Sequence, residues 1–167
     1  MMIREKMIYS CKQAFVYLLL FISLSTAVDW YRTHDSPSKL PPSLSSITID
    51  GERVDLIAES YESPVVVYFW ATWCSVCRFV SPSLSWVSQY YPTYSIALNS
   101  GSNQRVQAYV LQHDYQFKTI NDENGAWMKQ WKIAVTPTTY VLYQGETQSV
   151  TTGFTSPLGI LMRVWFS

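Results

Sequence analysis

Two cysteines three residues apart are the residues of this sequence best suited to chemistry: Cys74 and Cys77 enclose Ser75 and Val76. On the first turn of a helix this spacing puts both sulfurs on one face, where they can close a small disulfide ring. Unpaired N–H groups and the helix dipole would stabilise a thiolate at Cys74. We therefore expect a charged, reachable Cys74 that starts thiol–disulfide exchange and a more buried Cys77 that resolves the mixed disulfide.

Two other uses of the cysteine pair have less support. A closed structural zinc site takes four ligands, and only His34 and His113 remain to complete one. An inert structural disulfide would close so small a ring that its stabilising effect would be modest. We expect no metal and no cofactor, and redox exchange is the favoured interpretation.

The elements that would position the pair are a strand and a helix. Val65–Ala71 is a continuous apolar run rich in β-branched and aromatic residues, which is typical of a buried central strand, and Trp70 is expected to pack in the core. Residues 74–90 show helical spacing of apolar side chains, and Pro82 inside that stretch is expected to kink the helix. The cysteines would thus stand where the strand passes into the helix.

The rest of the chain alternates strands and helices. An Asp50-Gly51 turn between alternating apolar residues predicts the first hairpin, and Asn103 is the expected cap of a later helix. In order, we expect a hairpin over 46–56, a strand at 94–98, a helix through 106–111, a strand at 118–121, a helix over 125–132, a hairpin over 138–152 and a final helix from 156. This order predicts one mixed sheet with helices on both faces.

The N-terminal 28 residues resemble an export signal. Basic residues flank an uncharged apolar run at 14–28, an arrangement that keeps the N-terminus in the cytoplasm. Interfacial aromatic residues on both sides of the run favour a retained anchor. Small residues at 25–27 fit a cleaved signal peptide instead. A spacer rich in serine and proline follows at 29–43, and we expect one domain over 44–167.

The composition excludes several classes of protein. The 167 residues are 48% apolar and 14% charged, which excludes disorder as the overall state. The formal net charge is zero and the basic residues are scattered, so no nucleic-acid partner is expected. Three cysteines are too few for a scaffold held together by disulfides.

Three segments resemble thioredoxin-fold proteins. Phe69-Trp-Ala-Thr-Trp-Cys-Ser-Val-Cys77 is similar to their active-site segment, and Pro82 stands where they kink the following helix. Val135-Thr-Pro-Thr-Thr-Tyr140 is similar to the loop whose proline is cis and faces the cysteines. The resemblance covers residues 44–167. It implies an α/β thioredoxin fold, with a mixed central sheet, helices on both faces and an N-terminal β-hairpin.

The resemblance also implies roles for individual residues. Cys74 would be the nucleophile and Cys77 the resolving cysteine of a protein disulfide oxidoreductase. A cis Pro137 would bring the backbone of Thr136 beside the disulfide, where it can pair with a substrate strand. Trp73 would bind side chains of the substrate protein.

Within this fold, the chain resembles the membrane-tethered, periplasmic branch related to the cytochrome c maturation thioredoxins. Arg78-Phe-Val-Ser-Pro82 is most similar to the suppressor-for-copper-sensitivity D type. Two positions depart from these relatives. Thioredoxins carry a buried acid where this chain has Tyr68, and the maturation proteins often carry an acid where it has Val80. Both departures argue against a dedicated reductase of apocytochrome thiols.

The resemblance implies a thiol–disulfide oxidoreductase that exchanges or reduces disulfides of exported cysteine-containing proteins, with a link to copper tolerance. A membrane electron donor of the thiol-reducing type would keep it reduced. The expected location is the bacterial inner membrane, with one span at 14–28 and the catalytic domain in the periplasm, or the soluble periplasm after signal cleavage. Two alternatives stay open: an apocytochrome c thiol reductase, and a thioredoxin-like module that holds Cu(I) between the thiolates.

Overall fold

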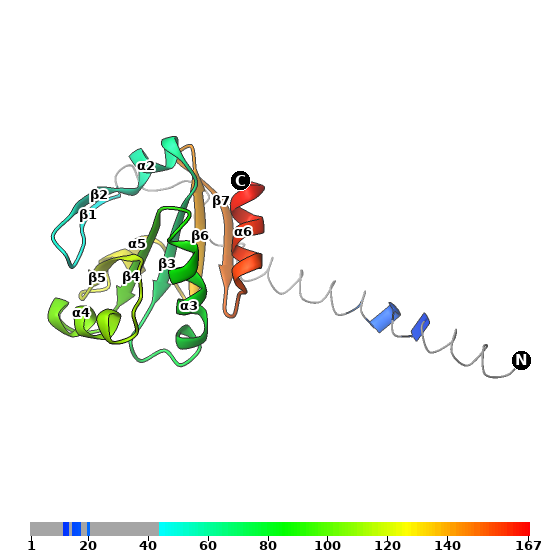
Figure 1. Ribbon diagram of the computed structural model, residues 1–167, viewed down its shortest axis with the longest axis horizontal. Coiled ribbons are helices and arrows are strands. Elements are labelled where there is room, and N and C mark those ends of the chain that lie inside the picture. Colours follow the sequence, from blue (N-terminus) through cyan, green and yellow to red (C-terminus); the bar gives the residue numbers. More distant parts are fainter. Residues whose placement is uncertain (1–11, 14, 18–19, 21–43) are drawn as a thin grey trace, which may run out of the picture. The chain divides into compact units, whose positions relative to one another are not determined.

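The computed structural model describes residues 44–167, and from the preceding segment only residues 12–13, 15–17 and 20 (Figure 1). The chain divides into two units, residues 1–34 and 35–167, and each is described by itself. The described residues of the first unit are helical and exposed. No described helix combines the length and the apolar character that a membrane span requires. The expected spacer and most of the expected export signal lie outside the described residues.

A five-stranded mixed sheet forms the centre of the second unit (Figure 1). Its strands, in spatial order, are β5 (Lys118–Asp122), β4 (Thr93–Leu98), β3 (Val65–Trp70), β6 (Thr138–Tyr143) and β7 (Glu146–Thr152). β3, β4 and β5 run parallel, whereas β6 and β7 are antiparallel to their neighbours. Every residue of β3 is buried, which confirms the apolar run as the central strand.

Alternate residues of β3 feed two hydrophobic cores, one on each face of the sheet. Val66, Tyr68 and Trp70 belong to the core that also holds both cysteines, and this core is covered by α3 (Cys77–Val87), α4 (Asn103–Gln112) and α6 (Pro157–Trp165). Val65, Val67 and Phe69 belong to the opposite core, which is closed by α2 (Leu56–Glu62), by the segment after α5 (Ala126–Gln130) and by the first hairpin. The predicted fold, with helices on both faces, is confirmed.

The first hairpin is shorter than predicted, and a helix follows it. Its strands are β1 (Ser45–Ile47) and β2 (Arg53–Asp55), joined through Gly51 at a positive φ of 86°. The prediction that the hairpin extends to Leu56 was wrong, because Leu56 begins α2. The Asp55 carboxylate accepts hydrogen bonds from the N–H groups of Ile57 and Ala58 at 3.0 and 3.1 Å, so this residue caps a helix instead of continuing the strand.

Two other helix starts differ from the predictions. The helix expected from residue 74 begins at Cys77, with Val76 as its N-cap residue. The N-cap of α4 is Ser102, one residue before the predicted Asn103. The Asn103 side chain has another partner, since its Oδ1 accepts a hydrogen bond from Nδ2 of Asn121 at 2.9 Å.

Candidate active site

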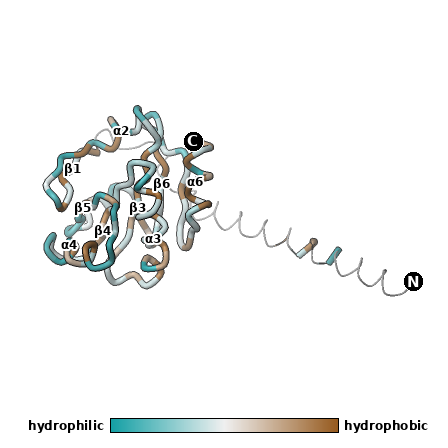
Figure 2. Tube along the Cα trace, viewed as in Figure 1, coloured by the Kyte–Doolittle hydropathy of each residue, from teal (hydrophilic) through white to brown (hydrophobic). Residues whose placement is uncertain are grey.

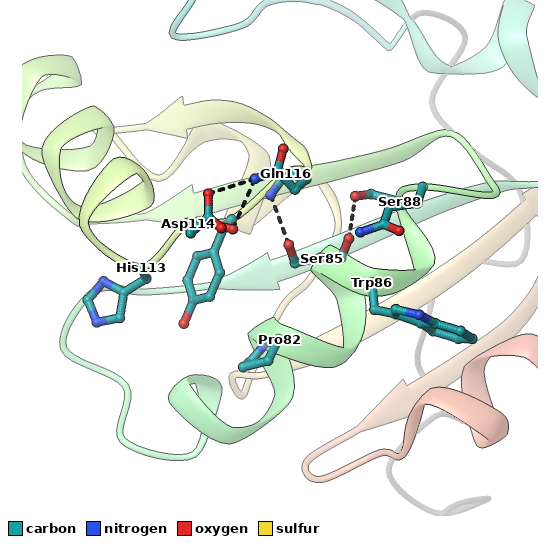
Figure 3. Close-up of a pocket in the computed structure, with 9 residues that line it drawn as sticks. Pro82, Ser85, Trp86, Ser88, His113, Asp114 and Gln116 are labelled. Atoms are coloured by element: carbon teal, nitrogen blue, oxygen red, sulfur yellow. Dashed lines mark hydrogen bonds between the residues drawn. The ribbon is translucent and has the colours of Figure 1, made fainter.

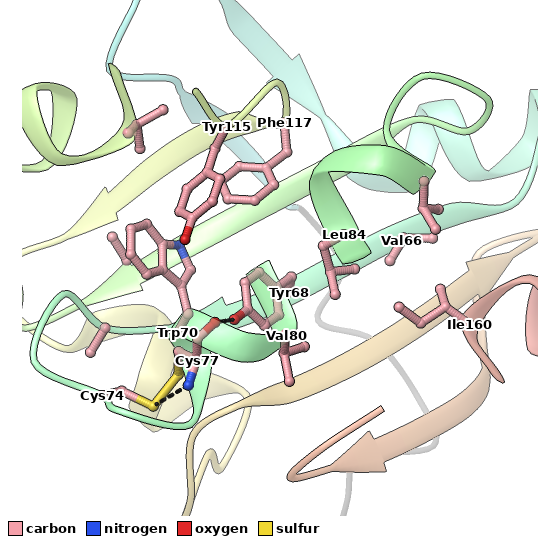
Figure 4. Packing of buried hydrophobic residues seen from close by; sticks show 14 of the residues in the cluster. Val66, Tyr68, Trp70, Cys74, Cys77, Val80, Leu84, Tyr115, Phe117 and Ile160 are labelled. Atoms are coloured by element: carbon pink, nitrogen blue, oxygen red, sulfur yellow. Dashed lines mark hydrogen bonds between the residues drawn. A yellow bond between two sulfur atoms is a disulfide. The ribbon is translucent and has the colours of Figure 1, made fainter. Parts of the chain in front are cut away.

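Cys74 and Cys77 are joined by a disulfide directly beyond the carboxyl end of β3 (Figure 4). Their sulfurs are 2.14 Å apart and their Cα atoms 5.3 Å apart. The chain leaves β3 in a turn in which the N–H of Cys74 donates to the carbonyl of Ala71 at 3.1 Å. Cys77 is then the first residue of α3, so the strand and the helix hold the pair between them.

The two cysteines differ in exposure in the predicted order. Cys77 retains 1% of its surface and Cys74 retains 7%. The expectation of a readily reachable Cys74 was nevertheless too strong, because the residue is buried. Both cysteines belong to the hydrophobic core beneath α3, which leaves only a small part of Cys74 open to a partner. Of the two, Cys74 keeps the larger exposed share of its surface.

The local electrostatics favour negative charge on Cys74. The backbone N–H of Cys77 donates a hydrogen bond to Sγ of Cys74 at 3.2 Å. This is the interaction expected when a side chain accepts from an unpaired N–H group at a helix start. Residues 69–92 contain no Asp or Glu, and Arg78 is the single charged residue among them. A thiolate at Cys74 would therefore accept a hydrogen bond from the Cys77 N–H, and the flanking sequence contains no carboxylate that would repel it.

Tyr68 occupies the position of the thioredoxin acid and is completely buried. Its hydroxyl lies 3.0 Å from Oγ of Ser81. The same hydroxyl donates to the carbonyl of Cys77 at 3.4 Å (Figure 4). Burial raises the pKa of Tyr68 further above its usual value of 10.0, so the phenol stays neutral. The site thus has the neutral hydroxyls of Tyr68 and Ser81 at the place where thioredoxins carry a carboxylate base. Sequence reasoning missed Ser81, although its place one turn after Cys77 puts it on the same side of the helix.

Tyr115 lies close to the same hydroxyl pair. Burial raises its pKa, and a hydrogen bond with Ser81 partly opposes that rise. Tyr115 also lines a surface hollow between α3 and the 113–116 segment, in which Gln116 binds Ser85 and Asp114 (Figure 3). None of the predicted site residues lines this hollow.

The Thr136–Pro137 peptide bond is cis, as the resemblance implied. Thr138, the first residue of β6, pairs with Phe69 near the carboxyl end of β3. The Thr136–Pro137 loop therefore lies at the end of the sheet from which the cysteine segment leaves. Pro137 is buried and Thr136 is half-buried. The pairing register of β3 with β6 places the loop at this end of the sheet.

Trp70 is buried and Trp73 is exposed, as predicted. Trp70 is buried and stacks on Tyr68, with 6.4 Å between the ring centroids. Trp73 is exposed, and its indole N–H donates to the carbonyl of Asn99 at 3.2 Å. That bond holds a large aromatic surface open to solvent immediately before Cys74.

The described residues contain no group of three or more His, Cys, Asp or Glu side chains that could hold a metal ion. His113 stacks on Tyr109, with its ring centroid 4.1 Å from that of the tyrosine. His34 lies outside the described residues.

Comparison with known proteins places the chain in a family. Residues 38–148 match the model of the AhpC/TSA family. The chain belongs to the AhpC/TSA family. The thioredoxin-like protein of Haemophilus influenzae is 34% identical to this chain over 93% of both chains. The thiol:disulfide interchange protein DsbE homolog of Paracoccus denitrificans is 27% identical over 74% of each chain.

Solved structures support the fold of this AhpC/TSA-family chain. A secreted disulfide oxidoreductase of Mycobacterium tuberculosis aligns with a TM-score of 0.63 at 22% identity, over 74% of this chain and 96% of that one. StoA of Bacillus subtilis aligns with a TM-score of 0.65 at 21% identity, over 78% and 100%. With its bonded CXXC pair at the start of α3, the chain is a thioredoxin-like disulfide oxidoreductase.

Proposed function

We propose that this oxidoreductase exchanges or reduces disulfides of exported proteins, with Cys74 as the attacking sulfur. The observation that carries the assignment is the hydrogen bond from the Cys77 N–H to Sγ of Cys74. It stabilises charge on the more exposed of the two sulfurs, and the thiolate is the form that attacks a disulfide.

The reaction proceeds in two exchanges. The Cys74 thiolate attacks one sulfur of a substrate disulfide, forms a mixed disulfide and releases the other substrate sulfur as a thiolate, which takes up a proton. The Cys77 thiol then loses its proton and attacks Sγ of Cys74, which releases the second substrate thiol. Two electrons pass to the substrate and the protein is left with its Cys74–Cys77 disulfide. Because Tyr68 is neutral, the proton of Cys77 passes to water or to the leaving substrate sulfur.

The substrate would bind where exposed apolar side chains meet the Thr136–Pro137 loop. Trp73, Val76 and Val135 are exposed large apolar residues next to the cysteines or to this loop in sequence. An extended substrate segment can pair with the backbone of Thr136 as an added strand, while its side chains rest on Trp73. This arrangement would bind extended cysteine-containing chains with little sequence specificity.

We propose a moderately reducing couple. Only Ser75 and Val76 stand between the cysteines, and neither offers a charge to the Cys74 thiolate. A less stabilised thiolate makes the dithiol a better reductant, as in the contrast between thioredoxin at about −270 mV and DsbA at about −120 mV. A thiol-reducing membrane donor would then regenerate the dithiol after each turnover.

The proposed location is the periplasmic side of the inner membrane, with residues 14–28 as anchor or as cleaved signal. The basic flank and apolar run support export. The name of one relative, the soluble secreted antigen MPT53 of Mycobacterium tuberculosis, describes a secreted protein. A link to copper tolerance has its support in the resemblance of Arg78–Pro82.

Insulin reduction tests the nucleophile assignment. The wild-type protein should precipitate insulin chains with dithiothreitol as electron source, and Cys74→Ser should lose this activity while its thermal unfolding stays close to that of the reduced wild type. Cys11→Ser is the matched control and should keep full activity, because Cys11 precedes the apolar run. Turnover retained by Cys74→Ser would refute the assignment.

A further inference from the structure

The hydrogen bonds between the parallel strands β3 and β4 follow a regular step. Val66 stands opposite Thr93 in the pairing register, and its N–H donates to the carbonyl of Pro92 at 2.9 Å. In a parallel ladder such bonds recur evenly at every second residue. Six residues further along both strands, the same step would join the N–H of Thr72 to the carbonyl of Leu98. This would be the last bond before the cysteine segment.

The hydroxyl group of Ser100 occupies that step instead. Its oxygen accepts the Thr72 N–H at 3.0 Å, and the hydroxyl donates to the Leu98 carbonyl at 3.0 Å. Ser100 and Thr72 are both buried, so water does not readily replace either bond. One hydroxyl group thus bridges two main-chain groups that the strand register would otherwise pair directly. It keeps the ends of β3 and β4 further apart than a direct bond would.

The turn after β4 places Ser100 where it can make this bridge. Its two neighbours, Asn99 and Gly101, have positive φ values of 45° and 90°, a conformation that asparagine and glycine adopt more readily than other residues. The chain therefore turns directly after Leu98, and the Ser100 side chain returns to the end of its own strand. Residues 99–105 carry no apolar side chain, and the segment that leads into α4 is hydrophilic (Figure 2). This local sequence is suited to a hydrogen-bonded turn.

The bridged step lies at the base of the segment that carries the nucleophile. Thr72 stands two residues before Cys74, and the Cys74 N–H closes a turn onto the carbonyl of Ala71 at 3.1 Å. The bond from Trp73 to Asn99 orients an exposed side chain, whereas the bond at Thr72 holds the main chain itself. A shift of Thr72 would therefore pass directly to Cys74.

We propose that Ser100 is a positioning residue of the redox site, which sets the place of the Cys74 sulfur through the main chain of Thr72. This inference rests on the proposed role of Cys74 as the attacking sulfur. The thiolate is stabilised only while its Sγ stays within reach of the Cys77 N–H, 3.2 Å away, and a hydrogen bond weakens steeply when it bends. Without the Ser100 hydroxyl, the Thr72 N–H either pairs directly with the Leu98 carbonyl or stays buried without a partner. Both results move Cys74 away from its donor.

The pH dependence of alkylation at Cys74 tests this role. The reduced full-length wild type and Ser100→Ala are treated with iodoacetamide at a series of pH values, and mass spectrometry of the peptides separates Cys74 from Cys77. The apparent pKa of Cys74 should rise by about 1 in Ser100→Ala, the effect of losing one hydrogen bond to a charged group. Labelling at pH 7 should then slow by up to about tenfold. At pH 10, where the thiolate forms in both proteins, their rates should agree within about threefold.

Ser60→Ala is the matched control. The Ser60 hydroxyl also bridges two main-chain groups, because it accepts the Gly145 N–H at 2.9 Å and donates to the Ile57 carbonyl at 2.7 Å. It is completely buried, but it lies at the opposite end of the sheet, beside the turn between β6 and β7. Both substitutions should lower the temperature of thermal unfolding, and only Ser100→Ala should change the apparent pKa of Cys74.

An unchanged or lowered apparent pKa of Cys74 in folded Ser100→Ala, or an equal rise in Ser60→Ala, would overturn the proposal. Preferential labelling of Cys77 in the wild type would instead refute the proposed function, and this inference with it. If Ser100→Ala does not fold, hydrogen exchange of the reduced wild type, followed by NMR, decides. The Thr72 amide should exchange at least about a hundredfold more slowly than in an unfolded chain, and fast exchange would show that the bridge does not hold the segment.

Discussion

The backbone N–H of Cys77 donates a hydrogen bond to the sulfur of Cys74 across 3.2 Å. The bond exists because α3 begins at Cys77 and leaves its first N–H groups without helical partners. One of these donors, the Cys77 N–H, binds the sulfur of Cys74, the more exposed of the two cysteines. The start of the helix thus gives the two cysteines different chemistry, although they belong to the same small ring.

Alkylation of the reduced protein should show this difference directly. With limiting iodoacetamide at pH 7, we expect Cys74 to be modified at least tenfold faster than Cys77, because it is more exposed and carries the stabilised thiolate. Peptide mapping by mass spectrometry gives the ratio. Preferential labelling of Cys77 would contradict the assigned roles.

The hydroxyl pair beneath the disulfide should contribute to stability as a unit. Tyr68→Phe and Ser81→Ala each remove a partner of the 3.0 Å contact, and a buried hydrogen bond contributes about 1 kcal/mol to the free energy of unfolding. The double-mutant cycle in urea should give a coupling energy of about 0.5–1.5 kcal/mol. As a control, Ser81→Ala combined with Tyr140→Phe, a substitution in the opposite core, should change the free energy of unfolding by the sum of the two single effects. If Ser81→Ala and Tyr68→Phe were additive in the same way, the contact between the two hydroxyls would contribute nothing to stability.

Acid should weaken the start of α2 through Asp55. Hydrogen bonds from Ala58 N–H and then from Ser45 hold the pKa of Asp55 below its usual 3.8. A lowered folded-state pKa stabilises the protein above the unfolded value, and this stabilisation is lost as the pH falls through the folded value. Asp55→Ala should cost about 1 kcal/mol in the free energy of unfolding at pH 7.

The difference between wild type and Asp55→Ala should narrow as the pH is lowered below 3.8. Thermal unfolding across a pH series measures it, and Asp55→Asn, which keeps a capping side chain, should lie between the two at pH 7. A gap that does not change with pH would show that the charge of Asp55 has no part in the cap.

Trp73 should act on substrate binding and leave the chemistry of the disulfide intact. Trp73→Ala is expected to raise the KM for insulin about tenfold, the loss of roughly 1.4 kcal/mol of aromatic contact, with little change in kcat. Exchange with glutathione, which is too small to reach the indole surface, should keep its wild-type rate. Trp165→Ala is the matched control, since Trp73 and Trp165 are 64% and 63% exposed. If both substitutions raised the KM for insulin equally, Trp73 would have no specific part in substrate binding.

Much of the fold follows from local pattern. The continuous apolar run at Val65–Ala71 identified the central strand, which ends at Trp70, and Ser156–Pro157 marked the start of α6. The cysteine pair and the cis Pro137 were both anticipated, the second only through the family resemblance. These features are encoded by neighbouring residues, so a sequence is enough to find them.

Features that depend on distant residues were missed. α2 has seven residues, and its cap depends on how Asp55 is oriented at the end of β2. Tyr115 reaches the site from a loop that approaches Ser81 only in the folded chain. For the final helix the sequence predicted only its start at residue 156, because a sequence does not show which apolar side chains of a helix stay exposed.

Trapping a mixed disulfide tests the central claim most directly. Reduced Cys77→Ser protein keeps the attacking sulfur and lacks the one that would release the substrate, so incubation with insulin should accumulate a covalent complex. Proteolysis and mass spectrometry should then place the insulin cysteine on Cys74. No complex, or one carried on Cys11, would contradict the assignment of Cys74 as the nucleophile.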